Sequence, residues 1–514
     1  MEINFFNSKS GEKTCTVNSK YLHSKYSPVT EAEKFVNSIP EITPDLIILV
    51  SPGLPYCYNK LKTRFPNVKI AAINFDIQFS NTLWDYEWVP NGQISLNSFL
   101  SELFICFDLK KIHIETWYPS LNIWPVEIQK IQNLIKELVN RETAVNITRK
   151  YFGKRWFKNI IRNIFFISKT IYLKTKIEIP VLIAAAGQSL EDKERLLKSG
   201  YFFKIAVTSA SGFLCNNSLL PDLFFITDGG YWAKEHFIPM YFAKEGINFF
   251  LQNMNLAISM EAAIPGVILE NTNILPMSYN SPFTESLLKI NNIKYMKAKE
   301  NGTVAGSAVE FALEYSNKNI YLAGLDLGPG KNSFHARPGV QETRNRNETL
   351  RTNSLMENIP LHSGQMEIYK NWFENIPAEK KQKLAIITPS PVQIQSIKKI
   401  PQDELIMGIK PESILKNNDL FYHSETLNDK RLNTVNYLKK MISNIKKYTI
   451  SDYYNDGVFS NIISYIDWDN YRAMESDLKN KSPTKADEVL ENIKINCIDF
   501  ISKEIKRYDN HEFL

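Results

Sequence analysis

The stretch Pro180-Val-Leu-Ile-Ala-Ala-Ala-Gly-Gln-Ser-Leu190 decides the fold of this 514-residue chain. A short apolar run is followed by small residues, a glycine and a hydroxyl, which is typical of a buried strand that turns directly into a helix. Gly187 would let the backbone approach a ligand, and Ser189 can cap the helix or bind a phosphate oxygen. Capping alone explains Ser189 equally well.

Apolar runs alternate with helical patterns from this stretch to about residue 397. The expected strands are 181–185, 204–207, 223–226, 248–252, 319–325 and 383–388. Such alternation predicts a mostly parallel sheet with helices on both faces.

Polar and glycine-rich residues follow several of these strands, and the carboxyl ends of parallel strands meet at one edge of a sheet. Asn301-Gly302-Thr303 precedes a predicted helix whose first turns consist almost entirely of small residues. Such a helix start can bind an anion, but it can equally allow close helix packing. An Asx turn would equally explain Asp228. The residues expected to bind a phosphate-bearing donor are Gly187, Gln188, Ser189, Ser209, Thr227, Asp228, Asn301, Gly302, Thr303 and Asp326.

Two histidines lie in the segment that follows the strand 319–325. His335 stands in a loop rich in glycine and proline, and His362 precedes a helical pattern. Histidine is the general base best matched to neutral pH, although a lone histidine is more often structural. Both are candidate catalytic residues.

Composition excludes several classes of protein. The net charge of +6 is spread along the chain, which gives no ground for nucleic-acid binding. Five scattered cysteines show no metal-ligand spacing and favour a reduced compartment. The start lacks the pattern of a secretory signal, and no run approaches the ~20 apolar residues of a spanning helix. We therefore expect a cytoplasmic protein without membrane insertion and without a bound metal.

The patterns divide the chain into four segments. Residues 1–142 are expected to form a smaller Rossmann-like domain, because the strands 45–50 and 68–73 flank one helix. The turn between them has a single glycine between two prolines, so we interpret this unit as structural. Residues 143–179 are expected to be a helical connector, 180–400 the central sheet domain, and 401–514 a C-terminal helical domain. The predicted fold class is α/β, with a Rossmann-like, mostly parallel central sheet.

These loops together resemble the motility-associated factor (Maf) glycosyltransferases, which share a core domain with MptE-like hydroxymethylpterin pyrophosphokinases. The resemblance rests on four stretches with His335, and extends to a lead-in helix near 146–163. The four stretches are Ala-Ala-Gly-Gln-Ser-Leu (185–190), Pro-Asp-Leu-Phe-Phe-Ile-Thr-Asp (221–228), Asn-Gly-Thr-Val-Ala (301–305) and Ile-Tyr-Leu-Ala-Gly-Leu-Asp-Leu (320–327).

The core also looks like bacterial sialyltransferases that use CMP-activated sugars. That resemblance implies an inverting glycosyltransferase that moves a nonulosonic acid (pseudaminic, legionaminic or sialic type) from a CMP donor to Ser or Thr of flagellin, in support of flagellar assembly and motility. It implies no required cofactor. It also ranks His362, in Leu-His-Ser, above His335 as the base.

Two positions depart from the family's pattern. Gln188 stands where the first loop usually carries proline, and Thr388-Pro-Ser-Pro391 replaces a glycine pair. The donor is therefore expected to sit differently. Two alternatives stay open: an ATP-dependent pterin pyrophosphokinase that holds Mg²⁺ through Asp228 and Asp326, and a non-catalytic flagellin-binding protein.

Overall fold

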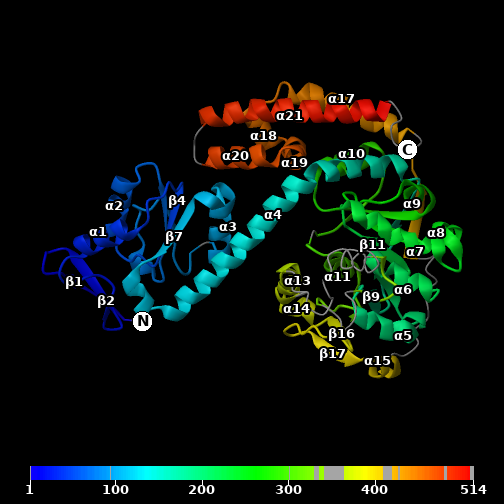
Figure 1. Cartoon of the computed structure of the whole chain (residues 1–514), viewed down its shortest axis with the longest axis horizontal. Coiled ribbons are helices and arrows are strands. Elements are labelled where there is room, and N and C mark those ends of the chain that lie inside the picture. The colour runs from blue at the N-terminus through cyan, green and yellow to red at the C-terminus, as the bar shows by residue number, and fades with distance from the viewer. Residues whose placement is uncertain are drawn as a thin grey trace, which may run out of the picture. The chain divides into compact units, whose positions relative to one another are not determined.

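The chain forms two compact units in the computed structural model, each shown in Figure 1. The structure describes residues 2–92, 94–299, 301–328, 335–340, 364–408, 420–426, 429–479 and 483–509. The first unit contains Met1–Tyr151 and Asp467–Ile493, and the second contains Phe152–Ile466 and Lys494–Leu514. The segment 401–514, expected to be one helical domain, thus contributes to both units.

An eleven-stranded sheet forms the centre of the second unit. Its strand order is β17-β16-β15-β9-β10-β11-β12-β13-β8-β18, and the short strand β14 also pairs with β13. Among the described strands of this sheet, β18 alone pairs antiparallel, with β8. The strands are β8 (Lys169–Leu173), β9 (Val181–Ala184), β10 (Phe203–Val207), β11 (Leu223–Ile226), β12 (Asn255–Ser259), β13 (Asn273–Ser278), β14 (Met296–Lys297), β15 (Ile320–Ala323), β16 (Leu384–Thr388), β17 (Lys398–Pro401) and β18 (Phe421–Glu425). The expected mostly parallel sheet is confirmed.

Helices connect these strands because both faces of the sheet are apolar and must be covered. Every residue of β9, β11 and β15 is buried. The described helices of this unit are α5 (Glu194–Lys198), α6 (Ser211–Asn216), α7 (Ile238–Phe242), α8 (Gly246–Asn253), α9 (Gly266–Asn271), α10 (Pro282–Ile290), α11 (Val304–Tyr315), α13 (Gly364–Glu374), α14 (Ala378–Lys381), α15 (Gln402–Gly408), α17 (Lys430–Ile445), α18 (Ile450–Asn455) and α19 (Gly457–Ile466). Three 3₁₀ helices, η4 (Gln188–Lys193), η5 (Thr208–Ala210) and η6 (Tyr231–Phe237), follow strands at the carboxyl edge.

One expected strand is wrong. Residues 248–252 lie in the helix α8, and the strand β12 begins at Asn255. The run Asn-Phe-Phe-Leu-Gln is too short for its periodicity to separate a buried strand from a helix. The strand β18, which pairs with β8, lies in a segment expected to be helical.

Helix α4 (Pro125–Phe166) is a single helix of 42 residues. The sequence predicted two helices with a boundary near 142, but no glycine or proline stands between Val126 and Phe152 to end the first. In the second unit, the Phe157 ring stacks on Phe283 with centroids 4.8 Å apart and meets the edge of Phe500 in α21 (Pro483–Asp509).

The first unit contains the expected small Rossmann-like sheet, parallel and in the order β6-β5-β4-β7. The Asp76 side chain caps the turn after β5 by accepting from the Gln78 N–H, in keeping with a structural role. An antiparallel sheet, β1-β2-β3, precedes it. The elements of this unit are β1 (Ile3–Asn7), β2 (Lys13–Val17), β3 (Lys20–Tyr21), α1 (Pro28–Ser38), β4 (Leu46–Val50), α2 (Tyr56–Arg64), β5 (Lys69–Ile73), η1 (Ile77–Phe79), β6 (Tyr86–Trp88), α3 (Leu96–Cys106), η2 (Leu109–Lys111), β7 (Ile112–Thr116), η3 (Tyr118–Asn122) and α20 (Trp468–Lys479).

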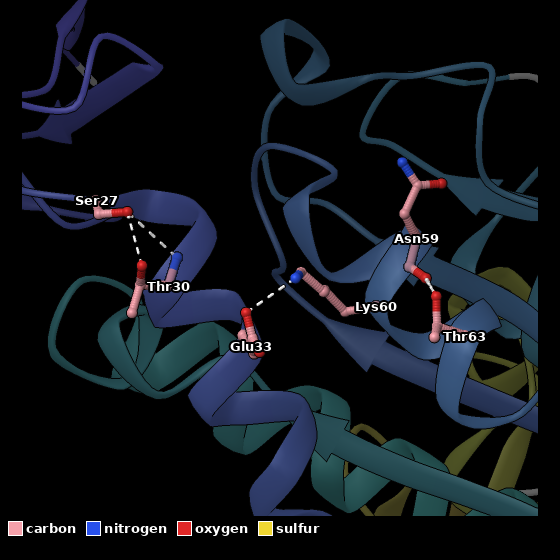
Figure 2. A network of polar contacts seen from close by, with 6 residues as sticks. All are labelled: Ser27, Thr30, Glu33, Asn59, Lys60 and Thr63. Carbon is pink, nitrogen blue, oxygen red and sulfur yellow. Dashed lines mark hydrogen bonds and ion pairs between the residues drawn. The ribbon is translucent and has the colours of Figure 1, made fainter.

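Local polar contacts fix the helices on this small sheet. Figure 2 shows Ser27 capping α1 through Thr30, and an ion pair of 2.9 Å between Glu33 of α1 and Lys60 of α2. Both partners of the pair are substantially exposed, so it contributes at most about 1 kcal/mol. Burial of the apolar strands therefore supplies most of the stability.

The five cysteines are buried and free of disulfides. Among the residues described, none of the helices is long and apolar enough to cross a membrane.

His23 is a buried imidazole in the first unit, and we expect it to make this unit sensitive to acid. Its Nε2 accepts the Leu54 N–H at 2.9 Å, and the ring packs against Tyr56 and Trp117. Burial lowers the pKa of His23 to about 3, whereas an unfolded histidine titrates near 6.5. The unfolded state therefore binds more protons than the folded state between these values, so stability is full above pH 6.5 and falls as the pH drops.

The expected loss is about 3 kcal/mol between pH 7 and pH 4.5, measured by urea unfolding. His23→Gln, which keeps an acceptor but cannot titrate, should remove most of this dependence. His423→Gln, at an exposed position of β18, should leave it unchanged. Equal acid sensitivity of the wild type and His23→Gln would refute the assignment.

Candidate functional site

The order in which the chain adds strands to the sheet reverses between β9 and β15. From β9 the strands β10 to β13 follow on one side, and β15, β16 and β17 fill the other. Ligands of open α/β sheets bind in the crevice at the carboxyl ends of strands where the order reverses. Gly187 follows β9 and Asp326 follows β15, so both lie at this switch point.

Asp326 and Ser189 are brought together, and they bond to each other. The Asp326 Oδ2 accepts the Ser189 N–H at 2.8 Å, and its Oδ1 accepts the Ser189 hydroxyl at 2.5 Å. A Cβ at Gly187 would lie only 2.5 Å from this carboxylate, which explains the glycine. The Asp326 carboxylate thus lies at the start of η4, where a bound anion would otherwise accept from the helix N–H groups. The donor-binding role of these residues stays a prediction.

Lys193 ties the same turn to β16, and the sequence analysis missed it. It is 1% exposed, and its Nζ donates to the Thr388 carbonyl at 2.6 Å. Burial lowers the pKa of Lys193, while the carboxylates of Asp192 and Asp326 act in the opposite sense. The Ser390 hydroxyl donates to the Leu325 carbonyl at 2.8 Å. The stretch Thr388-Pro-Ser-Pro391, which departs from the family's pattern, therefore takes part in the hydrogen bonds that connect the ends of β15 and β16.

Asp228 is an exposed carboxylate at the end of β11, after the half-buried Thr227. Its Oδ1 accepts the Gly230 N–H at 2.7 Å, which is the Asx turn that the sequence left open. Gly229 packs so tightly under Trp156 of α4 that a Cβ would lie 2.3 Å from the indole Nε1. The turn holds this exposed carboxylate in place.

Helix α4 also fixes the loop that follows β12. Asn159 donates to the carbonyls of Gly229 and Glu261, and Asn163 donates to those of Met260 and Ala262. One helix face therefore positions the ends of β11 and β12. Residues 146–163, where the resemblance predicts a lead-in helix, lie within α4.

His236 lies within the field of Asp228, and His335 lies close enough to His236 to act on it. His236, in η6, has a pKa lowered to about 4 by burial, which the Asp228 carboxylate opposes and His335 reinforces. Burial also lowers the pKa of His335. A bridge pairs His335 with Gly187, and the Ala336 N–H donates to the Ala186 carbonyl at 2.8 Å. Both imidazoles are therefore neutral near pH 7 and able to accept a proton.

His236 could have been suspected from the sequence, because it follows the Thr227-Asp228 strand end by eight residues. For two other residues expected to bind the donor, the structure gives the position and the burial. Ser209 lies half-buried in η5 after β10, and Gln188 lies half-buried at the start of η4. His362, the expected base, lies outside the described residues.

The start of α11 is the best-formed anion site among these loops. Thr303 caps the helix, with its Oγ1 accepting the Gly306 N–H at 3.1 Å. The Asn301 Oδ1 accepts from the Thr303 N–H and the Ser307 hydroxyl at 3.4 and 3.2 Å. Within the described part of the chain, the Asn301 Nδ2 is buried without a hydrogen-bond acceptor. A ligand oxygen at the helix start would satisfy this donor.

Tyr369 of α13 connects this helix start to Asp228. A Cβ on Gly302 would lie 3.3 Å from the Tyr369 ring, so only glycine leaves the present spacing. Burial raises the pKa of Tyr369, and the negative charge of Asp228 raises it further. The structure therefore brings together Asp228, the two histidines and the Asn301-Gly302-Thr303 turn. In the described ranges, it forms no cluster of three or more His, Cys, Asp or Glu side chains suited to a metal ion.

Comparison with known proteins agrees with the resemblance. Residues 158–332 match the family described as 6-hydroxymethylpterin diphosphokinase MptE-like. An uncharacterized protein of Treponema pallidum (strain Nichols) is 34% identical over 294 residues, which are 56% of this chain and 63% of that protein. The chain thus spans less than two thirds of that relative.

A solved structure is similar along the whole chain. The Maf glycosyltransferase of Magnetospirillum magneticum AMB-1 matches 100% of this chain and 93% of its own, with a TM-score of 0.57 and 11% identity. At that identity the likeness concerns the fold. The chain therefore contains an MptE-like domain within the fold of a Maf glycosyltransferase.

Proposed function

We propose that this chain is an inverting glycosyltransferase that moves a nonulosonic acid from a CMP-activated donor to a Ser or Thr hydroxyl of flagellin. The observation that carries the proposal is the convergence of a glycine-lined helix start, an exposed carboxylate and two neutral histidines at one edge of an MptE-like sheet. The fold shared with a Maf glycosyltransferase supports it.

The donor phosphate would sit at the start of α11. The first N–H groups of the helix, at Val304 and Ala305, point along the axis toward it, and the Asn301 Nδ2 would donate to a phosphate oxygen. These dipoles stabilise the charge that develops as the CMP leaves. Asp228, an exposed carboxylate held by the Gly230 N–H, would bind ribose or sugar hydroxyls.

The acceptor hydroxyl attacks the anomeric carbon from the face opposite the phosphate. As the new C–O bond forms, the bond to the CMP oxygen breaks, and the hydroxyl proton passes to an imidazole nitrogen. His335 is the described candidate for this base and His362 is the other. Burial keeps His335 unprotonated at neutral pH, which suits a general base.

A pterin pyrophosphokinase is the second candidate, because residues 158–332 match a family named for that activity. It would hold Mg²⁺ on carboxylates. Both oxygens of Asp326 already accept from Ser189, so a metal there would have to compete with these hydrogen bonds. A flagellin-binding protein without activity is the third candidate.

Calorimetry separates these candidates. We expect CMP to bind without metal, and Asn301→Ala to weaken the binding about tenfold, because a hydrogen bond to a charged phosphate contributes about 1.5 kcal/mol. Asn253→Ala, at the exposed end of α8, is the matched control and should have no effect. Binding of ATP with Mg²⁺ but not CMP would favour the kinase, and binding of neither would favour the inactive protein.

Removal of the base should separate turnover from binding. The test compares the single variants His335→Asn and His362→Asn with the wild type. The variant that removes the base should lower the rate of transfer by about 10²- to 10⁴-fold, while its affinity for CMP stays unchanged. His423→Asn, on β18 at the sheet edge, is the control. Because the pKa of His335 is lowered, a rate that depends on it should stay constant down to below pH 6.5. Full transfer by both variants would reject histidine as the base.

Asp326→Asn tests whether the switch-point carboxylate is structural. The amide nitrogen cannot accept from Ser189, so we expect a loss of about 1–3 kcal/mol in unfolding free energy and CMP affinity within threefold of wild type. Asp192→Asn, an exposed neighbour, should change neither quantity. A large loss of CMP affinity with unchanged stability would instead place the donor on this loop.

A further inference from the structure

A second pocket lies in the second unit, where two strands share one edge of β13. The strand β8 pairs with Asn273 and Ile274 at the start of β13, and β14 pairs with Met277 and Ser278 at its end. The two strands diverge between these pairs and leave a pocket of about 630 Å³. It is lined by Tyr172, Leu173, Lys289, Asn292, Ile293, Lys294, Tyr295, Met296, Lys297 and Tyr315.

The pocket is basic. Its lining includes three exposed lysines, Lys289, Lys294 and Lys297, and contains neither Asp nor Glu. The nearby carboxylates of Glu285 and Glu314 act on the phenols of Tyr295 and Tyr315, whose pKa values they help to raise. The lining therefore carries a formal charge of +3, in a concave site that concentrates its field.

One of the three ammonium groups is held in place before any ligand binds. The Lys294 Nζ donates to the Tyr172 hydroxyl at 2.9 Å and lies 4.6 Å from the centre of that ring. It also lies 5.4 Å from the ring of Tyr422, which stacks on Tyr172 with centroids 4.9 Å apart. The antiparallel pairing of β8 with β18 sets this stack. A lysine fixed by two rings loses less conformational freedom on binding an anion than a free lysine does.

We propose that this pocket binds a small soluble anion that carries two phosphate groups. The volume matches a small-molecule site rather than a surface for a polymer. A diphosphate matches the three positive charges, and the Tyr172 phenol, which accepts from Lys294, can add a hydrogen-bond donor. The site is separate from the start of α11 and does not depend on the glycosyltransferase proposal.

Pyrophosphate is the probe, titrated into the full-length chain by calorimetry with CMP in excess to fill the other anion site. We expect one saturable site. Lys294→Gln should raise its Kd about three- to tenfold, and Lys294→Gln with Lys297→Gln should raise it further. Tyr172→Phe, which keeps the stacked ring but removes the hydrogen bond to Lys294, should have a smaller effect of about twofold.

The control is Lys440→Gln, on the exposed side of α17, which should bind pyrophosphate as the wild type does. Thermal unfolding checks that each variant folds. An increase in sodium chloride from 50 to 300 mM should weaken the binding, because the lysines are exposed and screened.

The titration is repeated in Asn301→Ala without CMP, so that the result holds even if CMP does not bind. Retained pyrophosphate binding in that variant, lost on Lys294→Gln, supports the pocket. Binding that disappears with Asn301→Ala, or that Lys294→Gln and Lys440→Gln change equally, would overturn it. Absence of saturable binding would overturn it as well.

Discussion

The pair formed by Asp326 and Ser189 is the constraint on which the carboxyl edge of the large sheet depends. It joins the ends of β9 and β15 at the point where the strand order reverses, through two hydrogen bonds of one buried carboxylate. A buried carboxylate is stable only when its oxygens are bonded, and Ser189 supplies both donors. Lys193 also ties the end of β16 to this edge, because its Nζ donates to the Thr388 carbonyl. The loops beyond this connection therefore start from fixed positions.

That rigidity has a chemical consequence. The His335 bridge to Gly187 attaches the histidine loop to the same fixed edge, while α4 holds the turn of Asp228 from the other side. Burial lowers the pKa of both histidines, and the exposed carboxylate of Asp228 opposes this shift at His236. Such an arrangement can take up one proton near a bound anion without a metal ion.

The sequence predicts the fully apolar strands of the sheet, but it misses β8, β12, β13, β14, β17 and β18 and most of the side-chain partners. The runs at 181–184, 223–226 and 320–323 are apolar throughout, so their burial follows directly from composition. The bond between Ser189 and Asp326 joins residues 137 positions apart, and local patterns carry no information on such pairs. Lys193 was missed because a charged residue on a short helix is normally solvated, and only the packing of β16 buries it. His236 was missed although it follows the strand end at Asp228 by eight residues, because a single histidine at that spacing is a weak local signal.

The first loop and the start of α11 look alike in sequence, and the structure separates them. At the first loop, the Ser189 N–H already has an anionic partner from within the chain. At α11, Thr303 satisfies one N–H, while the buried Asn301 Nδ2 has no acceptor among the described residues. An unmet buried donor costs about 1–3 kcal/mol, whereas packing alone would be served by an apolar residue. The unmet donor therefore favours a ligand oxygen at α11, and the phosphate of the proposed donor would then lie beside Tyr369 and within the field of Asp228.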